Sequence, residues 1–198
     1  MSLFLDIGQG AGLAGASGIR PFLPPLLAGA LARGDLGIDF DGTGWQFLEA
    51  PGFLLAIFVL AVIWYAAGRS GPNRSLDMAA AALGLALGGL LFAGSLAEGG
   101  NTTWPGILAG VACAALAWAS VGALFERARR RLGAARDQQQ GGPGDFLALY
   151  AEAVALALAG LAILLPPVSF LALIAFVVLL IRGRNDADSK YAGLRVLR

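Results

Sequence analysis

The 198-residue sequence contains no histidine, one cysteine (Cys113) and only 14% charged residues. Without histidine, the chain lacks the side chain that most often acts as a general base or metal ligand near neutral pH. A single cysteine excludes an intrachain disulfide and a cysteine-built metal cluster. Paired aspartates for acid–base chemistry are also missing from the apolar segments. These absences argue against an enzyme, and we expect no catalytic residue, no resident metal and no cofactor.

Apolar residues dominate the chain and are gathered into long runs. Hydrophobic residues make up 58% of the sequence, and the mean hydropathy is +0.73. A soluble domain is typically nearer half apolar and one quarter charged. Long apolar runs are typical of a polytopic membrane protein. We therefore expect an all-α, polytopic transmembrane helical bundle of about six spans, with an integral membrane domain at residues 1–184 and a basic cytoplasmic tail at residues 185–198.

Five of these spans follow from the apolar runs after residue 51. Adjacent prolines end one helix and can begin the next, so Pro166 and Pro167 divide the last long run into two helices. A polar loop is expected at residues 126–144. The expected helices cover residues 52–67, 76–97, 104–125 and the two parts of 146–181.

Lysine and arginine are distributed unevenly among the expected loops. The loops at 68–75 and 126–144 and the tail are basic, whereas those at 34–51 and 98–103 contain no lysine or arginine, and Arg33 is the one exception to the alternation. Basic loops usually face the cytoplasm. We therefore expect a plasma-membrane location with a cytoplasmic C-terminus. Four arginines of the 126–144 loop are predicted to bind anionic lipid headgroups: Arg127, Arg129, Arg130 and Arg131.

The first apolar stretch, residues 10–34, carries one arginine and three prolines at its centre. Prolines interrupt helices because they lack the backbone N–H and clash with the preceding turn. The pieces on either side are residues 3–18 and 19–33, and each is short for a hydrocarbon core about 30 Å thick. The stretch is therefore expected to be broken at its prolines, as either one kinked sixth span or a re-entrant pair of half-length helices.

Arg20 lies at this interruption and is the first candidate for a binding residue. A charged residue within an apolar segment is a functional hypothesis by default, although it can also lie at the interface and only orient the protein. The prolines are also expected to free backbone carbonyls. A guanidinium favours an anion, whereas bare carbonyls favour a cation, so the sign of the ligand stays open. The residues predicted to bind substrate here are Arg20, Ser17, Pro21, Phe22, Pro24 and Pro25.

Glu152 is the second candidate, and Tyr150 close by completes the predicted substrate-binding set. Glu152 lies about 10 Å into an expected span. A carboxylate at that depth needs a partner, either Arg20 or a file of water. A buried carboxylate without a cation suits proton coupling, while a pair with Arg20 suits a structural lock, and both alternatives stay open. Asp6 and Gln9 are expected at the outer interface or in a frayed terminus.

Two motifs carry a family resemblance. The sequence Gly18-x-Arg20-Pro21-Phe22-x-Pro24 near the N-terminus and the closing Lys190-Tyr191-x-Gly193-Leu194-Arg195 resemble a family of small bacterial integral membrane proteins that is defined as a domain of unknown function. The resemblance covers most of the chain. Many members carry an acidic-Asp-Lys-x-Pro cluster after the second helix, where this chain reads Gly68-Arg69-Ser70-Gly71-Pro72-Asn73-Arg74. The resemblance implies a bacterial inner-membrane location and no known chemistry.

Two functional hypotheses follow. The first is a transporter, channel or lipid translocator whose small-molecule, ion or lipid substrate binds near Arg20 and Glu152. The second is a non-transporting scaffold or assembly protein whose basic cytoplasmic face binds membrane lipids or a partner. A polar cavity reaching Arg20 favours the first, and an Arg20 sealed in a salt bridge favours the second. Nucleic-acid binding is not expected, since no soluble domain with interleaved aromatics is present. The glycine-rich helix faces fit a homo-oligomer and intramolecular packing equally.

Overall fold

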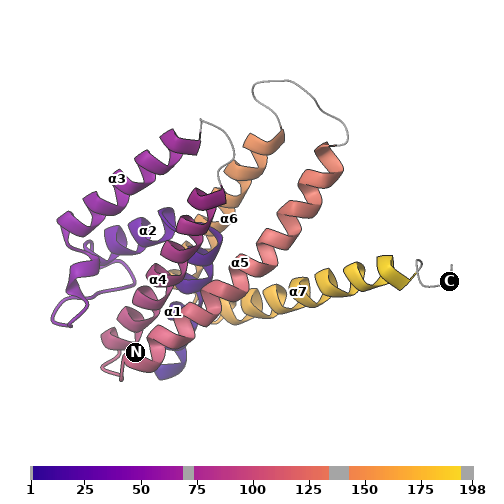
Figure 1. Cartoon of the computed structure of the whole chain (residues 1–198). Helices are drawn as coiled ribbons and strands as arrows, with labels where there is room; N and C mark the ends of the chain where they lie inside the picture. Colours follow the sequence, from indigo (N-terminus) through magenta and orange to yellow (C-terminus); the bar gives the residue numbers. More distant parts are fainter. Residues whose placement is uncertain (1, 69–73, 134–142, 193–198) are drawn as a thin grey trace.

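The computed structural model describes residues 2–68, 74–133 and 143–192, and side chains over 2–67, 75–124 and 149–182. These residues form α-helices and one short 3₁₀ helix, with no strand among them, so the all-α prediction is confirmed for this part of the chain (Figure 1). The elements are α1 (Leu3–Ile19), α2 (Leu23–Ala32), the 3₁₀ helix η1 (Gln46–Leu48), α3 (Pro51–Gly68), α4 (Arg74–Glu98), α5 (Trp104–Gly133), α6 (Pro143–Leu164) and α7 (Val168–Ala192).

The helix boundaries agree with the apolar runs at some ends and extend beyond them at others. The division at Pro166 and Pro167 is confirmed, because α6 ends two residues before them and α7 begins directly after. The polar loop predicted at 126–144 is wrong in extent, since α5 continues to Gly133 and α6 begins at Pro143. Residues 126–132 contain four arginines and one each of glutamate, alanine and leucine, all of which are good helix formers. The hydropathy of the sequence indicates where the apolar part of α5 ends, whereas the helix itself continues beyond that point.

Helix α1 lies at the centre of the bundle. It is buried almost continuously from Asp6 to Gly18 and packs against α2, α4, α5, α6 and α7. Its glycines make this possible by removing the side chains that would separate neighbouring backbones. At Gly18, an added Cβ atom would lie 2.1 Å from the carbonyl oxygen of Ala114 in α5. Helices α1 and α5 are therefore in backbone contact at a position where only glycine fits.

The α1–α2 connection is a sharp turn. Helix α1 ends at Ile19, Arg20 is extended (φ −143°, ψ 121°), and α2 begins at Leu23. Pro24 and Pro25 occupy the first turn of α2, where a missing N–H leaves no helical bond unmade, so they start a helix and do not break one. The interruption predicted near Arg20 is confirmed. Of the two alternatives, the structure has two separate short helices and not one kinked helix.

Three connections that contain no lysine or arginine meet at one end of the bundle, which we call the loop end. They are residues 34–50, which follow Arg33 at the end of α2, together with residues 99–103 and 165–167. All three contact the first half of α1. Gln9 donates a hydrogen bond to the carbonyl of Gly37 (3.1 Å), Asn101 donates to Asp6 (3.1 Å), and the space beside Gly8 is filled by the carbonyl of Pro166. Because α2 returns to this end, α1 and α2 form a hairpin whose turn, at Arg20, lies at the opposite end of α1. We call this opposite end the Arg20 end.

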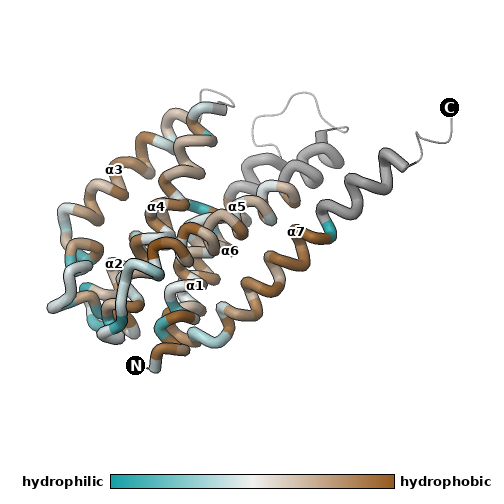
Figure 2. The backbone as a smooth tube through the Cα atoms, turned by 60° about the horizontal axis from the view of Figure 1, so that its bottom comes forward, coloured by the Kyte–Doolittle hydropathy of each residue, from teal (hydrophilic) through white to brown (hydrophobic). Residues whose placement is uncertain are grey.

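Two helices are long and apolar enough to cross a membrane, Ser75–Glu98 in α4 and Trp104–Leu124 in α5. Only 22% of the apolar window of α5 is buried, so most of its apolar surface faces outward. Figure 2 shows hydrophobic residues along α3 and the first part of α7, with hydrophilic residues mainly near helix ends and in the connections. These features fit a membrane protein, and the number of six spans stays a prediction. The remaining apolar helices are shorter: Leu23–Ala32, Pro51–Ala67, Leu149–Leu164 and Val168–Arg182.

Candidate functional site

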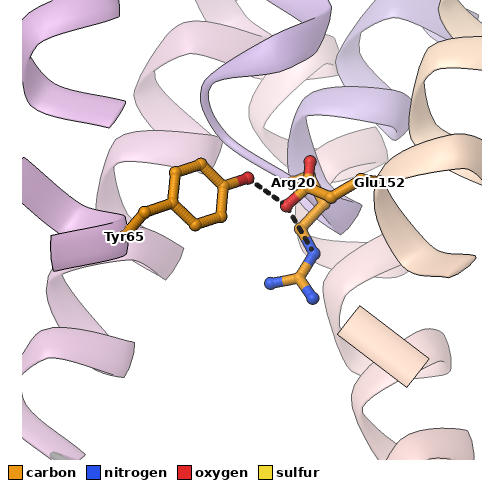
Figure 3. Close-up of polar contacts among 3 residues, drawn as sticks. All are labelled: Arg20, Tyr65 and Glu152. Carbon is orange, nitrogen blue, oxygen red and sulfur yellow. Dashed lines mark hydrogen bonds and ion pairs between the residues drawn. The ribbon is translucent and has the colours of Figure 1, made fainter. Parts of the chain in front are cut away.

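Arg20, Glu152 and Tyr65 meet at the Arg20 end of α1 (Figure 3). The Nε atom of Arg20 lies 3.2 Å from Oε1 of Glu152, and the hydroxyl of Tyr65 donates a hydrogen bond to the same oxygen. The side chain of Glu152 is 13% exposed and that of Arg20 is 27% exposed. The pair is therefore largely withdrawn from solvent but remains accessible on the arginine side.

Three elements distant in the sequence build this cluster. Arg20 is held in the extended link after α1, Glu152 comes from α6, which packs against both α1 and α2, and Tyr65 comes from the last turn of α3. Of the two partners that the sequence left open for Glu152, the structure shows Arg20. Tyr65 was not predicted. Tyr150 was predicted in this role but is 68% exposed and does not line the site, since it lies two residues from Glu152 and thus points away from it around the helix.

A cavity of about 290 Å³ opens beside this cluster. Its polar wall is formed by Arg20, Tyr65, Glu152 and Asp77, the last from the first turn of α4. The second carboxylate oxygen of Glu152, Oε2, is buried and has no hydrogen-bond partner. The cavity thus offers a cationic group and at least one unused acceptor. Aromatic rings cover much of the remaining wall: Phe22, Trp64 and Trp118.

Of the other residues predicted to bind substrate near the prolines, some line the cavity and others do not. Pro21 and Phe22 line the cavity, whereas Pro24 and Pro25 are fully buried and do not. The hydroxyl of Ser17 donates to the carbonyl of Leu13 in its own helix (3.0 Å). The carbonyl of Ser17 is covered by α4, because a Cβ atom at Gly84 would lie 2.6 Å from it. The Ser17 carbonyl is therefore in close contact with the protein and not turned toward the cavity.

The predicted lipid-binding arginines lie beyond the last described side chain of α5. The backbone of α5 continues helically through Arg127, Arg129, Arg130 and Arg131. Their side chains lie outside the described residues, so lipid binding at this segment stays a prediction.

Asp6 and Gln9 are fully buried at the loop end, so the prediction that they lie at an interface or in a frayed terminus is wrong. The carboxylate of Asp6 accepts from Asn101, and the backbone carbonyl of Asp6 accepts from the hydroxyl of Ser95 (2.8 Å). The connections after α2 and α4 fold over the first turns of α1. Burial of these two side chains therefore comes from segments far along the chain, for which the local sequence carried no signal.

The connection after α2 also holds three carboxylates, Asp39, Asp41 and Glu49, whose oxygens lie within 4.8 Å of one another. Hydrogen bonds within the loop account for their positions, since the backbone N–H of Asp41 donates to Asp39 (2.7 Å) and Gln46 donates to Asp41. Burial, and secondarily the neighbouring Asp41, raises the pKa of Glu49 above its ordinary value. We assign no ligand to this group.

Comparison with protein families gives one match. Residues 7–185 match the model of a family described as a domain of unknown function (DUF4126). The chain belongs to this family. No curated protein and no solved structure matches it. The resemblance to a domain-of-unknown-function family is thus confirmed.

Proposed function

We propose that this protein is an integral membrane transport protein that binds a small solute, an ion or a lipid headgroup in the cavity at the α1–α2 turn. The observation that carries the proposal is the cavity itself, which reaches the Arg20–Glu152 pair. Its volume of about 290 Å³ is at the lower limit of small-molecule sites, which favours a small substrate or headgroup over a bulky one.

Charge within a largely apolar bundle supports this proposal. Ionisable side chains within membrane helices usually mark substrate or ion pathways, and they pair with one another when no substrate is bound. Arg20 and Glu152 show this pairing, while Oε2 of Glu152 retains an unused acceptor site. A hairpin of two short helices with a charged turn is also the kind of discontinuous element that forms substrate sites in transporters.

The arrangement of the connections supports the proposed orientation. Apart from Arg33, the connections at the loop end contain no lysine or arginine, whereas the basic segments of the sequence lie next to the opposite ends of α3 to α7. By the positive-inside rule, the loop end faces away from the cytoplasm. We therefore propose a bacterial inner-membrane location, with the cavity at the Arg20 end near the cytoplasmic side and a cytoplasmic C-terminus.

One observation favours the second candidate function, a non-transporting scaffold. The ion pair joins α6 to the α1–α2 turn, and Tyr65 extends it to α3, which packs otherwise mainly against α2 and η1. A contact of this kind can serve only to hold α3 in place. In that case neither the wild type nor the variants described below carry any probe, and the variants only reduce the stability of the protein.

The proposal is tested in proteoliposomes with three probes: a fluorescent phospholipid for headgroup translocation, a pH-sensitive dye for proton flux, and a mixture of labelled small zwitterions and organic ions. The wild type is expected to carry at least one probe above protein-free vesicles. Arg20→Ala and Glu152→Gln are each expected to reduce that flux at least about tenfold, since one charge of the site is lost. Tyr150→Phe is the matched control, because Tyr150 is exposed outside the cavity. Wild-type flux in both charge variants, or no flux of any probe, contradicts the proposal.

A further inference from the structure

Four buried side-chain oxygens near the loop end have no hydrogen-bond partner: Oδ1 of Asp6, Oε1 of Gln9, Oε2 of Glu98 and the hydroxyl oxygen of Ser169 in the first turn of α7. Asp6 is 0% exposed and Gln9 is 1% exposed. Buried polar atoms are nearly always paired in folded proteins, so each unpaired one needs an explanation. The oxygens of Asp6, Gln9 and Glu98 can only accept, so they point to a donor or positively charged group that the described side chains do not supply.

The contacts of the three residues bring them to one place. Asp6 and Gln9 lie three residues apart in α1 and thus on one side of the helix. Gln9 donates to the carbonyl of Gly37, while the backbone N–H of Asp39, two residues further, donates to the carboxylate of Glu98. The carboxylates of Glu98 and Asp6 are close enough for their charges to repel each other. The 37–39 segment therefore joins Gln9 to Glu98, and Glu98 faces Asp6.

The chemistry of the set is that of a hard cation site. Because the carbonyl of Gly37 can only accept, the amide nitrogen of Gln9 must face it, and Oε1 is the atom left over. Two carboxylate oxygens and one amide oxygen are ligands that sodium, magnesium and calcium prefer. Within the described part of the chain, the one ion pair found joins Arg20 to Glu152 at the other end of α1, so no described lysine or arginine forms an ion pair with Asp6 or Glu98.

The surroundings of Asp6 are tightly fitted. A Cβ atom at Gly99 would lie 1.9 Å from Oδ2 of Asp6, so the α4–α5 connection rests directly on the carboxylate. Asn101 donates to that same oxygen (3.1 Å), which leaves Oδ1 as the free one. Both connections that cover the cluster are thus held by other atoms of the same side chains, Oδ2 of Asp6 and the amide nitrogen of Gln9. A cation bound to the free oxygens of these side chains would stabilise the closed loop end.

We propose that Asp6, Gln9 and Glu98 form a binding site for a hard metal cation, an alkali or alkaline-earth ion, at the loop end of the bundle. This site is separate from the cavity at Arg20 and does not depend on the proposed transport function. The proposal of a cation site therefore stands whether or not the Arg20 and Glu152 variants lose flux.

The test is a thermal-unfolding titration of the purified full-length protein in detergent, followed by tryptophan fluorescence after treatment with EDTA. Chlorides of sodium, potassium, magnesium and calcium are added separately, with ionic strength held constant by N-methylglucamine chloride. At least one cation is expected to raise the Tm by about 5 °C or more at a hundredfold excess over its Kd, because a ligand that binds only the folded state stabilises it.

Asp6→Asn and Glu98→Gln are each expected to abolish this rise while leaving a cooperative transition. Asp35→Asn is the matched control. It removes one negative charge from the same end, and asparagine tolerates the positive φ of 52° found there. The proposal is overturned if none of the four cations raises the Tm, if Asp35→Asn loses as much of the rise as Asp6→Asn, or if Tm responds to pH alone, which would assign the cluster to a shared proton.

Discussion

The two ends of α1 carry polar groups in opposite states. At the Arg20 end, the carboxylate of Glu152 is matched by the guanidinium of Arg20 and the hydroxyl of Tyr65. At the loop end, Asp6 and Glu98 repel each other, and one oxygen of each has no partner. An ion-paired carboxylate therefore lies at one end of the helix, whereas the carboxylates at the other end form no ion pair with a described lysine or arginine. Removing a negative charge is expected to lower the Tm at the Arg20 end and to leave the Tm unchanged or raise it at the loop end.

The difference also separates two kinds of site. A ligand can bind beside an ion pair by displacing some of its contacts or by using the free Oε2 of Glu152, so the Arg20 site suits reversible binding of a substrate. A group of acceptors without donors gains contacts when a cation enters, so the loop end suits an ion that stabilises the fold. Each prediction below tests one side of this difference.

The largest effect is expected at Gly18, close to the Arg20 end, where α1 touches the backbone of α5. Gly18→Ala inserts a Cβ atom 2.1 Å from a backbone carbonyl of α5, which cannot move aside without displacing the helix. We expect a loss of about 3 kcal/mol in the free energy of unfolding, together with loss of both sites. Gly160→Ala in α6 is the control, since nothing lies within 4 Å of its Cβ position, and it is expected to stabilise the helix slightly. Equal stability of the two variants, measured by denaturant titration in mixed micelles, would show that the α1–α5 contact is unimportant.

The next effect concerns the compensated end. Arg20→Met and Glu152→Met each leave one charge without its partner, and each is expected to cost about 1–3 kcal/mol. This is less than for a fully buried pair, because Arg20 is 27% exposed. The double variant is expected to cost less than the sum of the two, since no unpaired charge remains. Strict additivity of the three unfolding free energies would mean that the ion pair contributes nothing.

The smallest effect concerns Glu49, a buried acid of the loop end that has hydrogen-bond partners. Its raised pKa means that the folded protein holds the proton more tightly than the unfolded chain, whose glutamate titrates near 4.5. The stability contributed by this proton is complete below about pH 4.5 and is lost as the pH rises through the folded pKa. Glu49→Gln is therefore expected to raise the Tm modestly at pH 7 and to leave it unchanged at pH 4. A variant that is less stable than the wild type at pH 7 would refute this assignment.

Much of the Arg20 site could be predicted from the sequence because charged residues are rare within the apolar runs. Glu152 needed a partner at depth, and the scarcity of charged residues reduced the alternatives to Arg20 or a file of water, between which the sequence could not decide. Tyr65 could not be predicted, since it lies 87 residues from Glu152 and a tyrosine near the end of an apolar helix is common at membrane interfaces. Tyr150 was chosen for its proximity along the chain, which does not bring a side chain onto the same helix face.

The fold of the first 32 residues was only partly predictable. The prolines indicated an interruption, but whether the chain continues across or turns back depends on what α1 and α2 pack against. The burial of Asp6 and Gln9 depends likewise on the connections near residues 37–39 and 99–101, which reach α1 only in the folded bundle. Polar residues close to a chain end are by default expected to be exposed, so this cluster carried no local signal.

The most direct measurement compares Asp6→Asn with Glu152→Gln in cation-free buffer. Both variants remove one buried negative charge and keep the shape of the side chain. The ion pair at the Arg20 end, and the lack of one with a described lysine or arginine at the loop end, predict that Glu152→Gln lowers the Tm, whereas Asp6→Asn leaves it unchanged or raises it. A fall in Tm for Asp6→Asn as large as that for Glu152→Gln would contradict the distinction between the two ends.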